Sequence, residues 1–375
     1  MRARPTPLAV ILADRIRSRG PITFAEYMEV CLYHPEHGYY SKTNQKPRRD
    51  YFTNVDLSPI FGRLLARQFH QMWTLLDRPN PFFLVEAGAG TGELAKQILD
   101  CAAESLRDFY SALHYVAVER SIPRREALAH TLASHAAGGR LAHSAELPAE
   151  IEQGCVFSNE LLDAMPVHRL LQVEDSLREL YVAVADDEFY EQAGPLASPA
   201  LAVYFTEQAI TLQDQQQAEV CLEASRWMVE VAGRLRRGFV LTVDYGYCAR
   251  ELYNERHLRG TLMAYERHRA SEDYFRAPGE QDLTAHVNFT ALEKSGLRGG
   301  LLRTGFTSQS NFLLALARRT QFEDLQCETM NEQQQSRARL LFKTLIFPEG
   351  MGGTFQVLVQ HKGIESPHLA GFDPL

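Results

Sequence analysis

Short apolar runs alternate with helical patterns through the middle of the chain, and this alternation limits the fold more than any other feature. The apolar runs lie at 82–86, 115–119, 155–159 and 239–244. Runs of this length separated by helical periodicity are typical of βαβ units, whose crossover connections place the strands parallel. The sequence therefore predicts an α/β fold built on a parallel sheet.

Other segments indicate what surrounds that sheet. Helical patterns are expected at 8–16, from 24 onward, at 60–76, at 215–236 and at 333–345. Residues 168–192 read as strands joined by charged turns, which predicts an antiparallel excursion, while 247–290 is too irregular to assign. The run "TFQVLVQ" is expected as a last edge strand. The predicted organisation is an N-terminal helical segment at 1–80 and a core at 81–375 with insertions at about 165–215 and 247–290.

Charge and composition exclude several classes of protein. A formal net charge of −8 argues against a main affinity for nucleic-acid phosphates and is compatible with a basic protein substrate. The six cysteines are scattered without zinc-type spacing, so no metal site is expected. No stretch approaches the roughly 18 apolar residues of a membrane span, which predicts a cytoplasmic protein. A homodimer is possible.

The loop "VEAGAGTGELAKQI" follows the first expected strand and points to a nucleoside. A dinucleotide fingerprint needs a third glycine at position 93, but Glu93 stands there and the glycines are Gly88, Gly90 and Gly92. Such a loop can wrap an amino-acid tail and a sugar, with Glu86 placed to meet a cationic amino group. S-adenosylmethionine has that shape and charge. A plain packing turn is the alternative.

Further polar residues are expected at the same edge of the sheet. Glu119 ends the second strand, where a carboxylate can accept both hydroxyls of a ribose. Asn159 and Asp244 end the third and fourth strands. Because open α/β sheets bind ligands at the carboxyl ends of their strands, we expect these residues to surround one cleft with Gly88.

Several long segments are distinctive in the order in which they occur: "GPITFAEYMEVCLYHPEHGYY", "DYFTNVDLSPIFGRLLA", "VEAGAGTGELAKQIL", "SNELLDAMPVHRL", "VDYGY", "GTLMAYERHR", "DLTAHVNFTAL" and "TSQSNFLLALA". In these segments the sequence resembles the MidA family of S-adenosylmethionine-dependent methyltransferases, whose mitochondrial members are complex I assembly factors that dimethylate an arginine. The resemblance covers nearly the whole chain. It implies a Rossmann-like class I methyltransferase sheet, an N-terminal helical segment and an inserted region that binds a protein substrate.

The resemblance also implies roles for individual residues. Thr53, Asp56 and Ser58 would close over S-adenosylmethionine, together with the loop residues and Glu119. Asn159, Glu160 and Asp163 would face the transferred methyl group. The chain reads Thr53-Asn54-Val55-Asp56-Leu57-Ser58 where the family usually has "TAPEIS", and Gly88-Ala89-Gly90-Thr91-Gly92 where it commonly has "GPGRG". Because the first stretch should lie beside the reacting group, these differences bear on the acceptor more than on the cofactor.

Two assignments near the methyl group keep an alternative. Glu160 and Asp163 could hold an arginine guanidinium in a fork, or they could be acids that favour a helix N-terminus. His286 could be a substrate contact or a base, but a structural histidine is favoured. Asp244 is expected to line the substrate cleft.

Three functions remain open at this point. The first is a protein arginine methyltransferase acting on a respiratory-complex subunit or another protein. The second is a methyltransferase acting on a small molecule or RNA, and the third is an assembly factor that binds S-adenosylmethionine. A nicotinamide-dependent dehydrogenase is disfavoured by Glu93.

Overall fold

The structure is a computed structural model that describes residues 5–41, 59–136, 139–266, 269–325, 332–347 and 353–375. These residues form two compact units. The sheet unit comprises the described residues of 52–161, 228–245 and 293–375, and the accessory unit comprises those of 1–51, 162–227 and 246–292.

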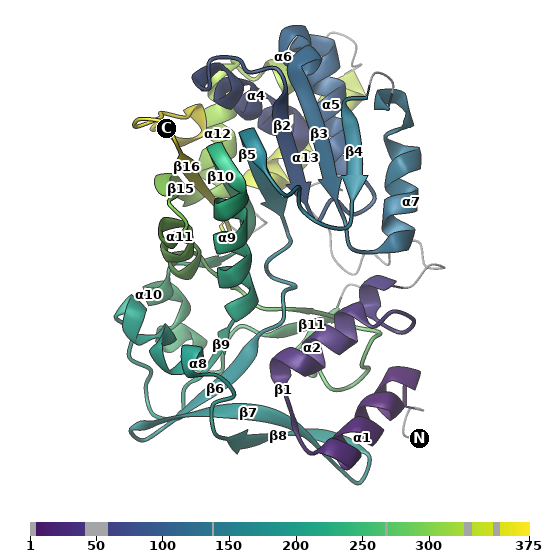
Figure 1. Cartoon of the computed structure of the whole chain (residues 1–375), viewed down its shortest axis with the longest axis vertical. Coiled ribbons are helices and arrows are strands. Elements are labelled where there is room, and N and C mark those ends of the chain that lie inside the picture. Colours follow the sequence, from purple (N-terminus) through teal and green to yellow (C-terminus); the bar gives the residue numbers. More distant parts are fainter. Residues whose placement is uncertain (1–4, 42–58, 137–138, 267–268, 326–331, 348–352) are drawn as a thin grey trace. The chain divides into compact units, whose positions relative to one another are not determined.

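A twisted, mostly parallel sheet forms the centre of the sheet unit (Figure 1). Its strands, in spatial order, are β15 (Leu302–Ser308), β16 (Phe355–Lys362), β10 (Leu235–Tyr247), β5 (Ile151–Asn159), β2 (Phe82–Ala87), β3 (Leu113–Val118) and β4 (Leu141–Ser144). From β10 to β4 the neighbours are parallel, whereas β16 is antiparallel to both β10 and β15. The strand order reverses between β5 and β2, which is where such sheets bind ligands.

Helices cover this sheet and bury its apolar faces. They are α4 (Pro59–Leu75), α5 (Glu93–Ser105), α6 (Arg107–Ala112), α7 (Ile122–Thr131), α12 (Gln309–Arg319) and α13 (Glu332–Ile346). Helix α4 packs on α5 and on α12. Its residues Phe61, Leu65 and Phe69 are almost fully buried in the same cluster as Phe157 of β5. Because helices cover the sheet, its strands are apolar on both faces, as expected for a parallel sheet between helices.

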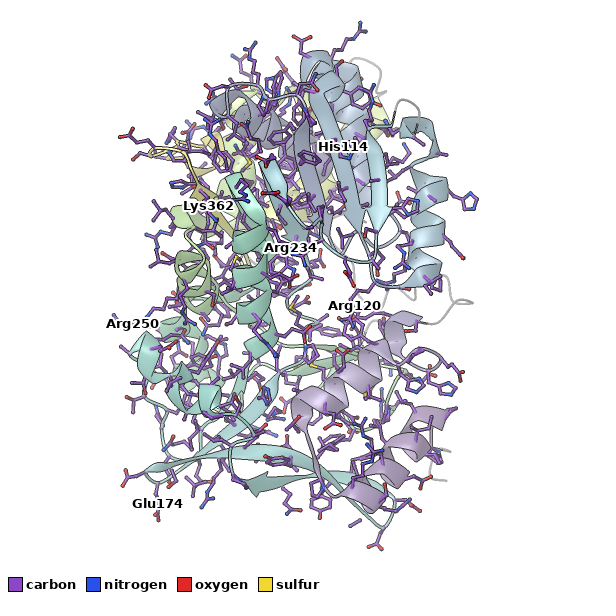
Figure 2. The ribbon with its side chains drawn as sticks, in the orientation of Figure 1. His114, Arg120, Glu174, Arg234, Arg250 and Lys362 are labelled. Carbon is purple, nitrogen blue, oxygen red and sulfur yellow. The ribbon has the colours of Figure 1, made fainter. Side chains whose placement is uncertain are left out.

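The junction between α9 (Leu222–Arg234) and β10 is fixed by two basic side chains of the sheet unit, both labelled in Figure 2. Lys362 donates to the carbonyl oxygen of Ala232 at 2.7 Å, and Arg234 donates to that of Pro148 at 3.0 Å. Positive charge at a helix C-terminus is favourable because the last carbonyl groups lack partners within the helix. The chain therefore enters β10 in a defined position.

Several expectations from the sequence are corrected here. The helix predicted at 215–236 is wrong in its first part, because β9 (Gln217–Val220) pairs with a neighbouring strand before α9 begins. The "TFQVLVQ" strand is not an edge, since β16 lies between β10 and β15. The predicted strand at 115–119 ends at Val118, and β4 was not predicted. The other three parallel strands are confirmed.

The close approach of β5 to β2 depends on a glycine. A Cβ atom on Gly154 of β5 would lie 1.9 Å from the carbonyl oxygen of Phe83 on β2. We expect Gly154→Ala to lower the free energy of unfolding by about 2 kcal/mol, because the backbone must separate to admit the methyl group. Gly233→Ala in α9 is the matched control, since its Cβ would meet nothing within 4 Å. Urea titrations that gave both variants the same midpoint would contradict this.

The accessory unit is built on an antiparallel sheet. Its strands are β6 (His168–Val173), β7 (Ser176–Ala185), β8 (Glu188–Gly194), β9 and β1 (Ile22–Thr23), with β7 paired to β1, β6 and β8. The antiparallel excursion predicted at 168–192 is thus confirmed. The helices of this unit are α1 (Pro7–Arg19), α2 (Phe24–Tyr33), α8 (Pro199–Tyr204) and α10 (Ala249–Leu252), while α9 and α11 (Phe289–Arg298) span both units.

Local sequence signals explain where the first two helices begin. Thr6 and Thr23 accept N–H groups of Ala9 and Glu26 at 3.1 Å, as N-cap residues do. The predicted apolar face of α1 is buried except at Ile11, which is 41% exposed.

The irregular region 247–290 contains a small sheet of β11 (Met263–Glu266), β12 (Arg269–Ser271) and β13 (Asp282–Thr284), and β14 (Val287–Asn288) follows.

A buried arginine joins three strands and a loop of the accessory unit. Arg169 of β6 is 3% exposed and pairs with Glu191 at 2.9 Å and with Glu219 at 3.7 Å. It also donates to the Tyr274 hydroxyl and the Gln217 side chain. Such a buried charge requires partners on all sides, so these contacts fix the packing of the unit.

None of the helices in the described ranges has the length and apolar character to cross a membrane.

Candidate functional site

The glycine loop connects β2 to α5 in a backbone conformation that side chains disfavour. Gly88, Gly90 and Gly92 have φ values of 77°, 54° and 85°, in the left-handed region. The N–H groups of Gly88 and Ala89 both donate to the carbonyl oxygen of Val118, at 2.9 and 3.0 Å. A Cβ on Gly90 would meet nothing within 4 Å. The loop is therefore tied to β3 on one side and open at Gly90.

Glu119 holds this loop from the end of the neighbouring strand. It follows β3 directly, and its two carboxylate oxygens accept the N–H groups of Gly90 at 2.9 Å and Ser121 at 2.8 Å. Each carboxylate oxygen has a second lone pair, so both can still accept a hydroxyl group. The structure thus brings Glu119 and the glycine loop together, as the sequence predicts for a nucleoside site.

Glu86 is a buried carboxyl group on β2. It is 3% exposed, and its Oε2 accepts the hydroxyl group of Tyr115 at 2.6 Å. Burial is the main reason that the pKa of Glu86 is raised to about 8. The hydrogen bond from Tyr115 acts in the opposite direction, and the negative charge of Glu119 raises the pKa further. The Glu86 side chain is therefore mostly protonated at neutral pH.

Protonation of Glu86 gives the ligand-free protein a pH-dependent stability. A carboxyl group with a higher pKa in the folded than in the unfolded chain favours folding at low pH, and this benefit is lost as the pH rises through the folded pKa. We expect the Tm of the ligand-free protein to fall between about pH 5 and pH 9 more steeply than that of Glu86→Gln, because glutamine does not titrate. Circular dichroism melts in matched buffers test this. Parallel pH profiles for the two proteins would contradict it.

Asn159 and Glu160 lie at the end of β5, beside the end of β10. Asn159 pairs in register with Val243, and the next residue, Glu160, donates its N–H to the Val243 carbonyl oxygen at 3.0 Å. Glu160 has a φ of 52°, which costs free energy for a residue with a side chain. The Asn159 amide donates to Oε1 of Glu160 at 3.1 Å. The Glu160 carboxylate is thus held in one direction by a strained backbone.

Asp244 completes this edge of the sheet. It is fully buried, and its two carboxylate oxygens accept the N–H groups of Leu161 at 3.2 Å and Tyr245 at 2.9 Å. The predicted neighbours Gly88, Glu119, Asn159 and Asp244 all lie at the carboxyl ends of adjacent strands. The contact from Asp244 to the Leu161 backbone makes it a support for the segment that carries Glu160.

Asp163 and His286 belong to the accessory unit. Asp163 is 1% exposed, and its carbonyl oxygen accepts the N–H of Ala285 at 3.0 Å. His286 donates its backbone N–H to Thr261 Oγ1 at 3.0 Å, and its ring packs on that of Tyr247. Burial, with a smaller effect of His257, lowers the pKa of His286 to about 4. The His286 ring is therefore neutral at physiological pH.

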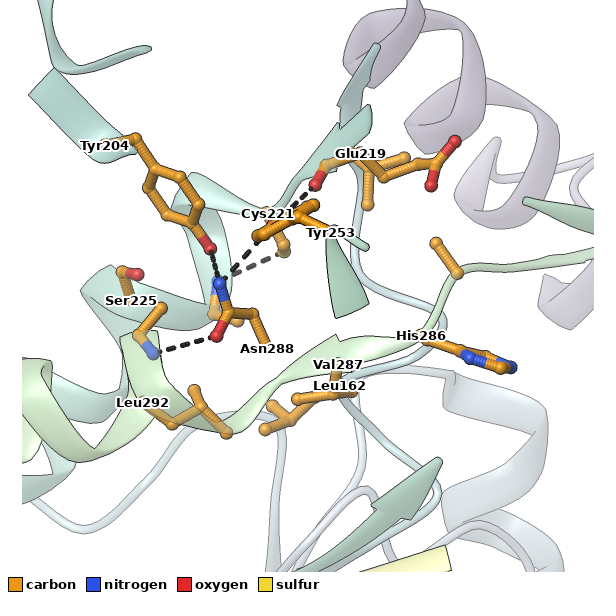
Figure 3. Close-up of a pocket in the computed structure, with 14 residues that line it drawn as sticks. Leu162, Tyr204, Glu219, Cys221, Ser225, Tyr253, His286, Val287, Asn288 and Leu292 are labelled. Atoms are coloured by element: carbon orange, nitrogen blue, oxygen red, sulfur yellow. Dashed lines mark hydrogen bonds between the residues drawn. The ribbon is translucent and has the colours of Figure 1, made fainter. Parts of the chain in front are cut away.

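A small pocket of the accessory unit is drawn in Figure 3, and His286 contributes to its lining. In its interior the Asn288 amide donates to the Tyr204 hydroxyl at 3.1 Å and to Gln208 at 2.8 Å, while its oxygen accepts the N–H of Ala291. The His286 ring points away from this group (Figure 3). Asn288 thus caps α11 and joins it to α8, which is a structural role.

The remaining predicted residues, Thr53, Asp56 and Ser58, lie outside the described residues. The described residues fit an S-adenosylmethionine molecule by their chemistry, with an acid at Glu86, an open glycine loop and the Glu119 acceptor.

The hydrogen bond from Tyr115 to Glu86 was not predicted. The signal for Tyr115 in the sequence is the alternation of side chains along two paired strands. Leu84 of β2 pairs with Tyr115, and Glu86 lies on the same face of β2 as Leu84.

No group of three or more potential metal ligands occurs within the ranges that the structure covers.

Comparison with known proteins identifies the family and the cofactor. Residues 64–307 match the family model described as "Putative S-adenosyl-L-methionine-dependent methyltransferase". A Burkholderia thailandensis protein crystallised with S-adenosyl-homocysteine is 32% identical, with a TM-score of 0.88 over 99% of this chain and 98% of that one. A native crystal structure from the same organism has a TM-score of 0.86 at the same identity. These matches confirm the predicted fold class and cofactor.

Curated relatives extend over most of the chain. The protein arginine methyltransferase NDUFAF7 homolog, mitochondrial, of Drosophila melanogaster is 28% identical over 96% of this chain and 86% of its own length. The protein arginine methyltransferase NDUFAF7, mitochondrial, of Homo sapiens is 28% identical over 82% of this chain and 73% of its own. The matched family, the related crystal structures and the loop geometry lead to one conclusion: the chain belongs to the S-adenosyl-L-methionine-dependent methyltransferases, in the family that its sequence resembles.

Proposed function

We propose that this enzyme transfers a methyl group from S-adenosylmethionine to an arginine side chain of a protein. The observation that carries the proposal is the arrangement of Asn159, Glu160 and Asp244 at the carboxyl ends of β5 and β10. The Glu160 side chain is fixed there by its strained backbone and by the hydrogen bond from the Asn159 amide. The buried Asp244 supports the same segment by accepting the N–H of the next residue. Strain of this kind persists where function requires a side chain in one position.

An arginine acceptor explains why acids are needed at this place. Methyl transfer from a sulfonium is an in-line displacement, so the enzyme mainly has to place the nucleophile and exclude water. A guanidinium remains protonated in proteins and presents its N–H groups as a planar fork that matches carboxylates. In this proposal Glu160 holds the guanidinium and draws its charge away from the attacking nitrogen, and Asp163 remains a predicted second carboxylate. His286, whose ring is neutral, is proposed to be structural.

Further parts of the proposal concern the cofactor and the partner. Thr53, Asp56 and Ser58 are proposed to close over the cofactor, whose methionine end contacts Glu86 and the glycine loop and whose ribose contacts Glu119. Insertions at about 165–215 and 247–290 are proposed to contact the protein substrate. The names of the curated relatives support a protein arginine acceptor. A complex I subunit as client, a homodimer and a cytoplasmic location remain predictions; those relatives are named mitochondrial proteins.

The acceptor can be identified by methyl labelling. A lysate from host cells lacking this protein is incubated with the purified chain and S-adenosylmethionine carrying a labelled methyl group, then separated into protein, RNA and small molecules. We expect the label in protein, as methylarginine after acid hydrolysis and at one peptide by mass spectrometry. Label in RNA or in a metabolite would overturn the proposal. Capture of a client without any label would favour an assembly factor instead.

A further inference from the structure

The Glu86 carboxyl group lies in surroundings that disfavour its charge. It is buried in the sheet unit, and its hydrogen-bond partner, the fully buried Tyr115 phenol, carries no positive charge that could balance a carboxylate. Within the described residues, no lysine, arginine or histidine forms an ion pair with Glu86. The titratable groups that act on it there are Tyr115 on β3 and Glu119 directly after that strand. An uncompensated buried carboxyl group favours its protonated form.

Glu119 adds to this effect through its own geometry. It accepts two backbone N–H groups, from Gly90 and Ser121, which fixes its side chain at the end of β3. Its negative charge repels a second negative charge at Glu86, and burial and this repulsion together raise the pKa of Glu86 to about 8. A cation brought next to Glu86 would reverse both effects, because an opposite charge within about 4–6 Å favours the ionised carboxylate.

We propose that Glu86 carries a proton in the ligand-free protein, releases it to solvent when the ammonium group of the cofactor binds, and is positioned for this exchange by the Tyr115 hydroxyl. The O–H bond of the carboxyl group breaks, the proton passes to the buffer, and the ammonium group becomes the counter-ion of the carboxylate. Tyr115 is a positioning residue, because it acts through the Glu86 carboxyl group, whose Oε2 accepts its hydroxyl group. The inference rests on the proposed contact between Glu86 and the methionine end.

Calorimetry with S-adenosyl-homocysteine tests the proposal, because this ligand keeps the ammonium group and cannot transfer a methyl group. Titrations of the full chain are run at about pH 6.5, where an α-amino group is mostly protonated, in three buffers of different ionisation enthalpy. The slope of binding enthalpy against buffer ionisation enthalpy gives the number of protons released. We expect about nine-tenths of a proton or more for the unchanged protein, since the pKa of Glu86 is about 8.

A second ligand provides a control that does not depend on any variant. Methylthioadenosine carries the same nucleoside without the amino-acid end, and we expect it to bind the unchanged protein with no proton release. Equal release with both ligands would place the proton elsewhere and overturn the proposal. Binding of S-adenosyl-homocysteine with a slope of zero would do the same, whereas absence of any binding would instead refute the cofactor site.

Two variants then assign the proton and the positioning role. Glu86→Gln should bind S-adenosyl-homocysteine with a slope near zero, and retention of the full slope would overturn the proposal. Tyr115→Phe should shift the midpoint of proton release, measured across pH, to a higher value, because the hydrogen bond from Tyr115 favours the ionised form. A packing role alone would leave that midpoint unchanged. Circular dichroism confirms that each variant is folded.

Discussion

Glu119→Ala is expected to weaken binding of S-adenosyl-homocysteine by about 10²- to 10⁴-fold. Two ribose hydroxyls bound to a charged acceptor contribute about 1.5–3 kcal/mol each, and each 1.4 kcal/mol corresponds to a factor of ten. The same substitution leaves the N–H groups of Gly90 and Ser121 without their carboxylate, so the glycine loop loses its hydrogen bond at Gly90. The bonds from Gly88 and Ala89 to the Val118 carbonyl oxygen remain. Isothermal titration calorimetry at one pH measures the change in dissociation constant.

Two further variants separate the ribose contact from a general loss of charge. Glu119→Gln keeps one acceptor oxygen and should lose about ten-fold in affinity, less than the alanine variant. Glu126→Ala removes an exposed carboxylate from α7 and should bind as tightly as the unchanged chain. If Glu119→Ala bound within three-fold of the unchanged chain, the ribose would not be held by Glu119.

The parallel strands were predictable because each is an apolar run buried on both faces, as Phe82, Leu84 and Val85 of β2 illustrate. Strand β4 was missed because it has four residues and lies half-exposed at the edge of the sheet. The glutamines before α9 suggested a longer helix, but pairing of β9 with β6 prevails over local propensity. Chain order alone gives no sign that β16 inserts between β10 and β15.

The meeting of residues from different strands at one edge of the sheet was predictable for a similar reason. Parallel strands place their carboxyl ends together, so residues that follow different strands, such as Glu119 and Asn159, share one edge once the strand assignment is right. The role of Tyr115 was not predictable, because it depends on which strand neighbours β2 and on the register between them. The strained φ of Glu160 has no signal in its residue type either.

Glu160→Gln is expected to lower kcat by about 10²-fold or more while the affinity for S-adenosyl-homocysteine stays within about three-fold. Removing one preorganised hydrogen-bond donor from an oxyanion hole costs about 2.7–4 kcal/mol of transition-state stabilisation, and we expect a loss on this scale for the Glu160 charge. Glutamine keeps the size and hydrogen-bonding shape of the side chain, so cofactor binding should persist. Single-turnover methyl transfer to the arginine-containing protein found by labelling measures the change. Turnover within a few-fold of the unchanged enzyme would show that groups other than Glu160 hold the guanidinium.

The backbone of Glu160 allows a stricter version of this experiment. Glu160→Gly removes the charge and also the strain of a φ of 52°, which costs a residue with a side chain about 1–2 kcal/mol. Gln321→Gly is the matched control, since Gln321 is exposed after α12 with a φ of 50°. Both glycine variants should be at least as stable as the unchanged chain, and only Glu160→Gly should lose activity. If Glu160→Gly melted well below Gln321→Gly, lost activity would reflect damaged structure and the catalytic assignment would fall.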